Sequence, residues 1–178
     1  MLTRENYFSP ENSMKYMGST QFKDFMQCEA SALARVRGEL PVLTSTALLV
    51  GSYVDAHFEG TLDLFRAQHP EIFKRDGSLK AEFEQANMSI ARAERDPFFM
   101  KFMAGEKQVI MTGVIESVPV KIRIDSYHAD RTIVDLKCMR NFAPIWSDEE
   151  RAKLPFVEAW GYDIQGAIYQ EIVFQNTG

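Results

Sequence analysis

Two aspartates and a lysine near the middle of the chain could together act on a phosphate. Asp125 ends the run 120–125, in which apolar and polar residues alternate as in a half-buried strand. Asp135 and Lys137 lie in a second β-prone run, 133–139. Side chains alternate across a strand, so Asp135 and Lys137 project from one face. Two acids and one base that converge on a point suit metal-assisted hydrolysis of a phosphodiester.

Whether the two aspartates meet depends on the register of the hairpin that joins the runs. If residues 129–131 form its loop, His128 pairs with Thr132 and Asp125 lies directly opposite Asp135. The Cβ atoms of such neighbours are about 4.5–5.5 Å apart, and like charges there are destabilising, which favours a cation between them. A slip by one residue would separate the aspartates onto opposite faces. The loop offers no glycine for a left-handed position, which weakens this register. The alternative is two solvated acids on an edge hairpin, because D-x-K is a short and common string.

Composition indicates an ordinary globular protein of one domain. The chain has 178 residues, 46% of them hydrophobic and 25% charged. No apolar run approaches the roughly 18 residues of a membrane span, and the N-terminus lacks the layout of a signal peptide. Two cysteines are too few for a disulfide scaffold. We therefore expect a cytoplasmic protein with no membrane partner.

The net charge of −5 argues against broad, nonspecific binding of nucleic acid. A local field for phosphate remains possible, because four cations cluster around the candidate site: Lys121, Arg123, Lys137 and Arg140. A bound divalent ion would add positive charge there. Affinity for DNA should accordingly be modest and sensitive to salt.

Hydrophobic periodicity predicts helices on both sides of an antiparallel meander. Helices are expected at about 21–35, 46–65, 79–95, 98–103 and 156–174, and strands at 107–115, 118–128 and 132–139, after a loose polar arm at 1–18. The period of 3.6 residues marks the helices and the period of two marks the strands. A sheet and helices that share one core indicate an α/β architecture.

His57 is a candidate metal ligand on the second predicted helix. It lies one residue from the apolar stripe that contains Val54 and Phe58, at the edge of the face that packs on the core. A neutral imidazole there could bind a metal ion. The alternative is a core histidine that hydrogen-bonds within the fold.

The last predicted helix carries a polar and aromatic face. Tyr162, Gln165 and Tyr169 fall at positions i, i+3 and i+7 and therefore share one side of the helix. These side chains could hydrogen-bond phosphates or support the lysine of the site. The alternative is a solvent-facing surface. Gly161 and Gly166 cost helix stability, which indicates close packing of the backbone.

These motifs, taken in order, resemble the PD-(D/E)XK nuclease superfamily. The resemblance is closer to its RecB-like branch and to phage exonucleases of the lambda exonuclease and exodeoxyribonuclease VIII type. It runs from about Ser19 to Gly178 and rests on the helix that starts near Ser19, the His57 helix, Ile124-Asp125, Val134-Asp135-Leu136-Lys137 and Tyr162-x-x-Gln165-x-x-x-Tyr169. It implies a restriction-endonuclease-like core, with a central mixed sheet and an antiparallel meander flanked by helices. The domain is expected at 19–178, after an arm at 1–18.

The resemblance also implies roles for individual residues. It assigns His57, Asp125, Asp135 and the carbonyl of Leu136 as ligands of Mg²⁺ or Mn²⁺, Lys137 to the attacking water or the transition state, Gln165 and Tyr169 as auxiliary catalytic residues, and Lys121, Arg123, Arg140 and Tyr162 to DNA contacts. Many relatives carry Glu where this chain has Asp135. Some relatives hold an iron–sulfur cluster with one early and three late cysteines. Cys28 resembles the early one, but no late trio follows, so no cluster is expected.

The function implied by the resemblance is a metal-dependent DNA exonuclease of phage or prophage recombination. The expected substrate is the end of a linear duplex, with 5′ to 3′ polarity. A single-strand annealing protein is the implied partner, and an oligomer is compatible. Relatives continue beyond the position of Gly178, so a further C-terminal segment is expected. The alternatives are a structure-specific endonuclease of the same fold and an inactive DNA-binding or scaffold module.

Overall fold

The computed structural model describes residues 1–41 and 44–178, which divide into two compact units. The first unit contains residues 1–41, 110–124 and 140–178, and the second contains residues 44–109 and 125–139. The two long strands contribute residues to both units.

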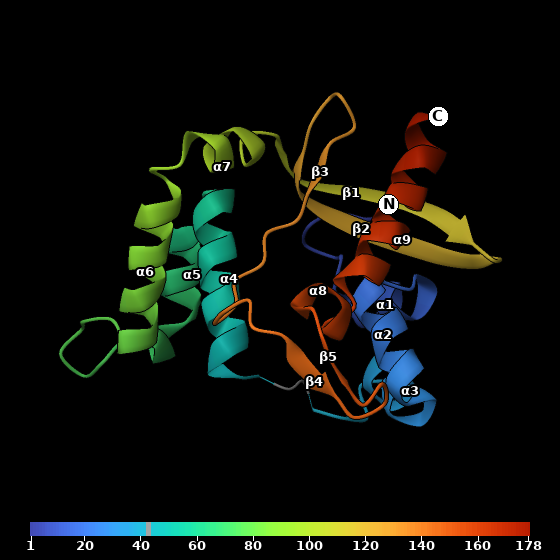
Figure 1. The fold of residues 1–178 in the computed structure, drawn as a ribbon, viewed down its shortest axis with the longest axis horizontal. Coiled ribbons are helices and arrows are strands. Elements are labelled where there is room, and N and C mark those ends of the chain that lie inside the picture. Colours follow the sequence, from blue (N-terminus) through green and yellow to red (C-terminus); the bar gives the residue numbers. More distant parts are fainter. Residues whose placement is uncertain (42–43) are drawn as a thin grey trace. The chain divides into compact units, whose positions relative to one another are not determined.

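Helices flank antiparallel strands, so the predicted α/β class is confirmed (Figure 1). The helices are α1 Pro10–Lys15, α2 Ser19–Gln27, α3 Glu29–Val36, α4 Thr46–Glu59, α5 Leu62–Gln68, α6 Ala81–Ala93, α7 Pro97–Phe102, α8 Phe156–Ala159 and α9 Tyr162–Thr177, with a 3₁₀ turn η1 at Pro70–Ile72. The strands are β1 Glu106–Ile115, β2 Val118–Tyr127, β3 Ile133–Val134, β4 Ile145–Ser147 and β5 Ala152–Leu154.

The hairpin between β2 and β3 has the predicted register. The strands of this sheet follow the order β1-β2-β3, and Ser126 lies opposite Val134 in the antiparallel β2–β3 pair. The loop is the predicted 129–131, because the amide of His128 donates to the carbonyl of Thr132 over 3.1 Å. Arg131 takes the left-handed position with φ of 68°, so the loop closes without a glycine.

The third strand is much shorter than predicted. It was expected over 132–139 but ends at Val134, and residues 135–139 are irregular. The physical reason is a competing acceptor. The amide of Leu136 donates to Oδ2 of Asp125 over 2.7 Å and is therefore not available to continue the ladder.

Three helices predicted as continuous are each divided in two. The first breaks at Cys28, whose backbone is extended, and the others break at left-handed glycines, Gly60 and Gly161. A Cβ at Gly161 would lie 2.8 Å from Cδ of Lys23, so the expected close packing is present there. The same expectation was wrong for Gly166, where a Cβ would meet nothing within 4 Å.

The N-terminal segment packs on the first unit and is not the loose arm that was predicted. Tyr7 is buried, and its carbonyl accepts a hydrogen bond from Nζ of Lys121 over 2.5 Å. Met17 forms an isolated parallel bridge with Val120 of β2. This parallel contact beside an antiparallel meander gives the mixed pairing that the resemblance implied.

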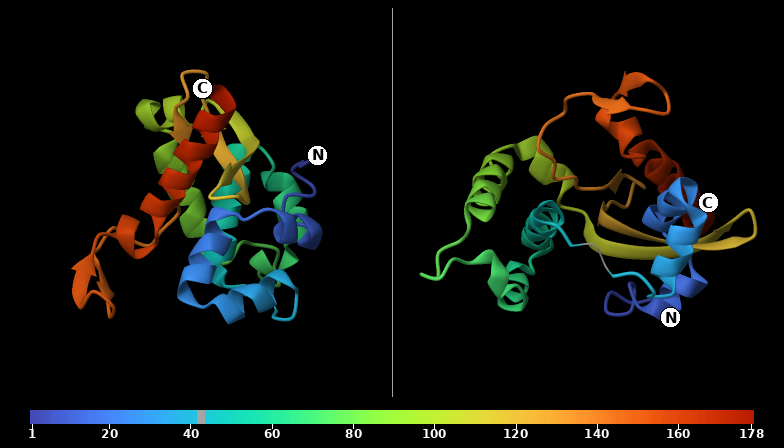
Figure 2. Two further views of the ribbon diagram at one scale, coloured as in Figure 1. Left: turned by 90° about the vertical axis from the view of Figure 1, so that its right-hand side faces the viewer. Right: turned by 90° about the horizontal axis from the view of Figure 1, so that it is seen from below.

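Helix α9 packs along the strand residues of the first unit. The side chain of Gln175 bonds both the amide and the carbonyl of Val114, at 2.9 and 2.8 Å. Asn176 donates to the carbonyl of Thr112 over 3.0 Å. Beside α8, the strands β4 and β5 form a hairpin that the sequence analysis did not predict, visible in orange in Figure 2. In the part of the chain that the structure describes, no helix is long and apolar enough to cross a membrane.

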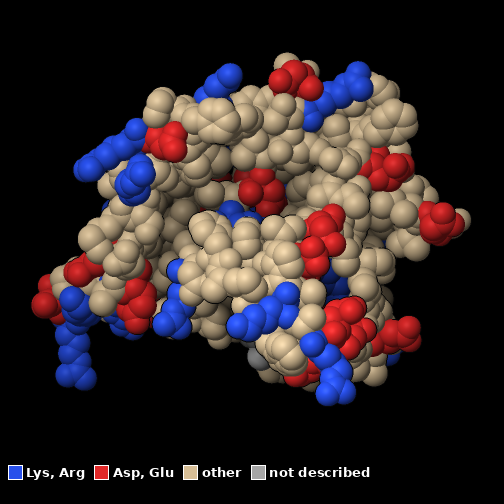
Figure 3. Space-filling view, in the orientation of Figure 1, with Lys and Arg blue, Asp and Glu red and all other residues tan. Residues whose placement is uncertain are grey.

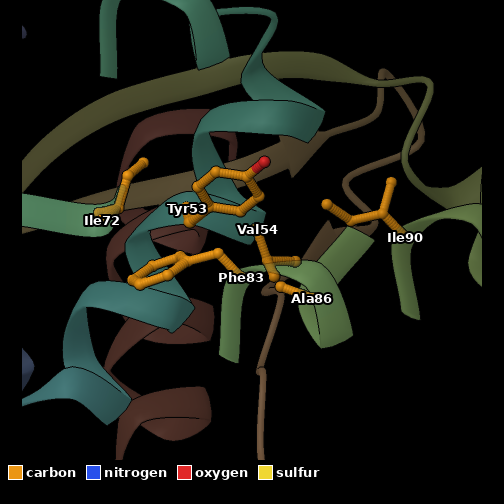
Figure 4. Close-up of a cluster of buried hydrophobic side chains, with 6 residues drawn as sticks. All are labelled: Tyr53, Val54, Ile72, Phe83, Ala86 and Ile90. Carbon is orange, nitrogen blue, oxygen red and sulfur yellow. The ribbon is translucent and has the colours of Figure 1, made fainter. Parts of the chain in front are cut away.

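The core of the second unit lies between α4, η1 and α6. Its buried residues are Tyr53, Val54, Ile72, Phe83, Ala86 and Ile90 (Figure 4). Leu136 packs against this cluster, which ties the segment after β3 to helix α4. The hydroxyl of Tyr53 donates to Asn87 over 2.9 Å, so the buried phenol has a partner.

Replacing Phe83 with alanine should lower the free energy of unfolding by about 3–5 kcal/mol, because the ring is 1% exposed and its removal leaves a cavity. Phe98, which is 70% exposed on α7, provides the control, and Phe98→Ala should change stability by about 0.5 kcal/mol or less. Urea unfolding of both variants measures the difference. Equal losses would show that this cluster is not the core of the second unit.

Candidate functional site

Asp125 is held by two donors from different parts of the second unit. Its Oδ1 accepts a hydrogen bond from Nε2 of Gln108 on β1 over 3.1 Å. Its Oδ2 accepts from the backbone amide of Leu136 over 2.7 Å. A carboxylate with a donor on each oxygen has a defined orientation, so Asp125 is the fixed point of the site.

The segment 135–137 presents its two charged residues beside this fixed carboxylate. Leu136 contacts the hydrophobic core and uses its amide on Asp125. Asp135 and Lys137 flank it and form an ion pair with each other. The structure thus brings together the three residues from which the sequence argument began.

Helix α4 supplies two more carboxylates. A small cavity is lined by Asp55, Phe58, Glu59, Met103, Gln108, Asp125 and Leu136. Its volume of about 10 Å³ is roughly the room that a single water molecule requires. Asp55 and Glu59 lie one turn apart, so both side chains reach the cavity from one side of the helix.

His57 lies on the other flank of α4 and does not line the cavity. Each residue of a helix turns by about 100°, which puts Asp55 and His57 on opposite sides of Val54. The imidazole Nε2 of His57 is 2.8 Å from Oε1 of Glu94, the C-cap residue that follows α6. The sequence argument placed His57 correctly at the edge of the apolar stripe, but it is Asp55 that faces Asp125.

The carboxylates around the cavity shift the pKa of Asp55. Burial, followed by the charges of Asp125 and Glu59, raises the pKa of Asp55 to about 7. Asp135 acts in the same direction, whereas Lys137 opposes it. A side chain with a strongly shifted pKa therefore lines the cavity, which is typical of functional sites.

The donor set fits a hard divalent cation. The oxygens around the cavity come from Asp55, Glu59 and Asp125, with Asp135 close enough to influence their charge. Carboxylates and neutral oxygens are the ligands that Mg²⁺ and Mn²⁺ prefer. A cation would also relieve the repulsion among the carboxylates, which adds to burial in raising the pKa of Asp55. Among the described residues, no group of three or more His, Cys, Asp or Glu side chains is arranged so that it could hold a metal ion without a change in side-chain positions.

The other predicted site residues belong to the first unit. Lys121 is only 3% exposed and is bonded to Tyr7, so its predicted role in DNA contact is wrong. Burial also lowers the pKa of its ammonium group. The guanidinium of Arg123 lies over the ring of Phe8, 4.9 Å from the centroid, and Arg140 is exposed.

The polar face of α9 is buried and is not the solvent face that was the alternative. Gln165 and Tyr169 are both buried, and the hydroxyl of Tyr169 donates to the carbonyl of Arg123 over 3.0 Å. Tyr162 has the ammonium of Lys23 over its ring, 5.3 Å from the centroid. The auxiliary roles of Gln165 and Tyr169 stay predictions.

The sequence argument missed Asp55, Glu59 and Gln108. A signal for the first two existed, because like charges at i and i+4 destabilise a helix and therefore suggest another purpose. No such pattern in the sequence indicates a role for Gln108. It is buried within β1 with φ of 56°, a backbone conformation that no pattern in the neighbouring residues indicates.

Comparison with known proteins identifies the family of this chain. Residues 18–178 match the model of a family described as a PDDEXK-like domain of unknown function (DUF3799). The chain belongs to this family. A crystal structure from Eubacterium rectale, named as a candidate exonuclease, is 50% identical to this PDDEXK-like domain, with a TM-score of 0.95 over 100% of this chain and 69% of that one. A search of curated proteins found no match. The resemblance to the PD-(D/E)XK superfamily is thus confirmed.

The shifted pKa of Asp55 predicts how the stability of the metal-free protein depends on pH. Its folded value of about 7 exceeds the ordinary 3.8, so the native state binds more protons between these values. The contribution of Asp55 to stability is present at low pH and is lost as the pH rises through about 7. Its slope is at most about 1.4 kcal/mol per pH unit.

Asp55→Asn should remove this contribution. Urea unfolding in a chelator, between about pH 4 and pH 8, should show the variant gaining stability relative to wild type as the pH rises. A constant difference between the two proteins across this range would contradict the assignment.

Proposed function

We propose that this PDDEXK-like domain is a metal-dependent deoxyribonuclease that hydrolyses phosphodiester bonds. The observation that carries the proposal is the fixed carboxylate of Asp125, held on both oxygens next to the Asp135–Lys137 pair. A fixed oxygen ligand beside a second acid and a cation is the arrangement that metal-assisted hydrolysis requires. The family match and the similar candidate exonuclease support the same chemistry.

We assign Mg²⁺ or Mn²⁺ to Asp125 and Asp135, with Asp55 and Glu59 from α4 and the carbonyl of Leu136. Asp55 takes the place that the sequence argument gave to His57, because it lines the cavity with Asp125. An all-oxygen set is compatible with Mg²⁺, whereas an imidazole would have favoured Mn²⁺. When bound, the ion supplies a Lewis acid and activates water at neutral pH.

Lys137 acts on the charge that develops at the phosphate. Its ammonium group donates hydrogen bonds and cannot ligate a metal ion. Its ion pair with Asp135 holds it at the site and leaves it beside the fixed Asp125. In the reaction we expect Lys137 to orient the attacking water or to stabilise the negative transition state.

The substrate we propose is the end of linear duplex DNA. The support is the similar structure that is named as a candidate exonuclease. An exonuclease of this kind would suit phage or prophage recombination and would pass its single strand to an annealing protein. On the face drawn in Figure 3, acidic and basic side chains are interspersed. With a net charge of −5, DNA affinity should be modest and should fall steeply with salt.

Lys137→Ala should lower single-turnover cleavage of linear DNA by about 10²- to 10³-fold, the usual cost of one positioned electrostatic contact. Mn²⁺ binding by calorimetry should remain. The Asp125→Asn variant should lose both DNA cleavage and Mn²⁺ binding. The His57→Ala variant should keep both, because His57 does not line the cavity. Lys74→Ala removes an exposed lysine paired with Glu84 and serves as the control. Normal cleavage by a folded, metal-loaded Lys137→Ala protein would remove the main support for the proposal.

Linear duplex DNA should be degraded while covalently closed circles persist, because only the linear form has ends. End-labelled and circular substrates, each incubated with Mg²⁺ or Mn²⁺, test this directly. Linearisation of the circle at a comparable rate would favour the structure-specific endonuclease. Absence of cleavage from both forms, with metal bound, would favour an inactive DNA-binding module.

A further inference from the structure

Gln108 is a buried polar side chain that uses only part of its hydrogen-bonding capacity within the described chain. It is 4% exposed, and its Nε2 donates to Oδ1 of Asp125 over 3.1 Å. Its Oε1 is buried and has no hydrogen-bond partner among the described residues. A buried acceptor without a partner is costly, so its retention needs a physical explanation.

The orientation of this amide follows from chemistry. The carboxylate of Asp125 can only accept hydrogen bonds, so the amino group of Gln108 must face it. The carbonyl oxygen therefore lies on the other side of the amide and cannot be exchanged with the nitrogen. Gln108 also lines the same small cavity as Asp55, Glu59 and Asp125.

The backbone of Gln108 is unusual as well. Its φ of 56° falls in the left-handed region, although it lies inside the strand β1. Such a residue bends a strand and redirects its side chain, and glycine is the residue that adopts this conformation without strain. Non-glycine residues in strained conformations cluster at functional sites. The side chain at this position therefore has a use that glycine could not supply.

We propose that Gln108 is a positioning residue of the divalent-cation site. Its Nε2 fixes Asp125, and its Oε1 accepts a hydrogen bond from a water molecule of the hydrated cation. The inference rests on the proposed function. The cavity of about 10 Å³ has room for about one water and not for the whole hydrated cation, so the water that Oε1 binds would be the one ligand of the cation inside it. Hydrogen bonds to ligating carboxylates commonly change metal affinity by about 10- to 100-fold.

Gln108→Met separates this role from a structural one. Methionine keeps the length and the buried volume but removes the amide. Calorimetry should show Mn²⁺ affinity lower by about 10- to 100-fold. The Mn²⁺ concentration for half-maximal cleavage should rise by a similar factor. The melting temperature of the metal-free protein should not fall, because the unpartnered oxygen is also removed. Gln68→Met, at an exposed position that ends α5, is the matched control and should change none of these three quantities.

Gln108→Gly is the second variant, because it removes the amide and relieves the strained backbone. It should be folded and should show the same loss of Mn²⁺ affinity. Wild-type Mn²⁺ affinity in a folded Gln108→Met or Gln108→Gly protein would overturn this inference and leave the proposed function intact. Unfolding of both variants would also overturn it, because Gln108 would then be structural. Failure of the wild-type protein to bind Mn²⁺ or Mg²⁺ would overturn the proposed function together with the inference.

Discussion

The arrangement of the candidate site in the second unit depends on the two hydrogen bonds that hold the Asp125 carboxylate. One carboxylate joins three segments, because β2 carries it, β1 supplies Gln108 and the chain after β3 supplies the amide of Leu136. The second bond ends the β2–β3 ladder early and replaces a backbone pairing with a side-chain acceptor. The same residue, Leu136, packs into the core with α4. The hydrophobic core therefore sets the position of the Asp125 carboxylate. A substitution that disturbs the packing of Leu136 would displace this carboxylate even though no charged residue is changed.

The site gathers like charges at a cost that the fold offsets elsewhere. Asp55 is repelled by Glu59, one turn further along α4, and by Asp125. The helix that carries them is anchored by Tyr53 and Val54 on the core and ends at a left-handed Gly60. A rigid support of this kind allows side chains to remain in an unfavourable electrostatic arrangement until a cation is present.

The sequence predicted the hairpin register only on the condition that residues 129–131 form the loop, because the period of two shows which residues share a face but not which residues pair. It therefore predicted that Asp125, Asp135 and Lys137 lie together. It could not decide which flank of α4 faces the site, because an apolar stripe has two edges and His57 and Asp55 occupy different ones. It treated Lys121 as exposed because charge usually is, whereas Tyr7 buries it. The breaks at Gly60 and Gly161 depend on single backbone conformations, which hydrophobic periodicity does not report.

The bridge between Met17 and Val120 has a consequence for self-association. β3 pairs with only the last residues of β2, so the backbone N–H and C=O groups earlier on that edge of β2 require other hydrogen-bond partners. Met17 provides them, since its amide donates to Pro119 over 2.9 Å and its carbonyl accepts from Lys121 over 3.0 Å. An uncovered strand edge is a template for another chain. In the first unit, the N-terminal segment thus covers a strand edge at which chains could otherwise associate. Removal of this segment would lower the solubility of the protein.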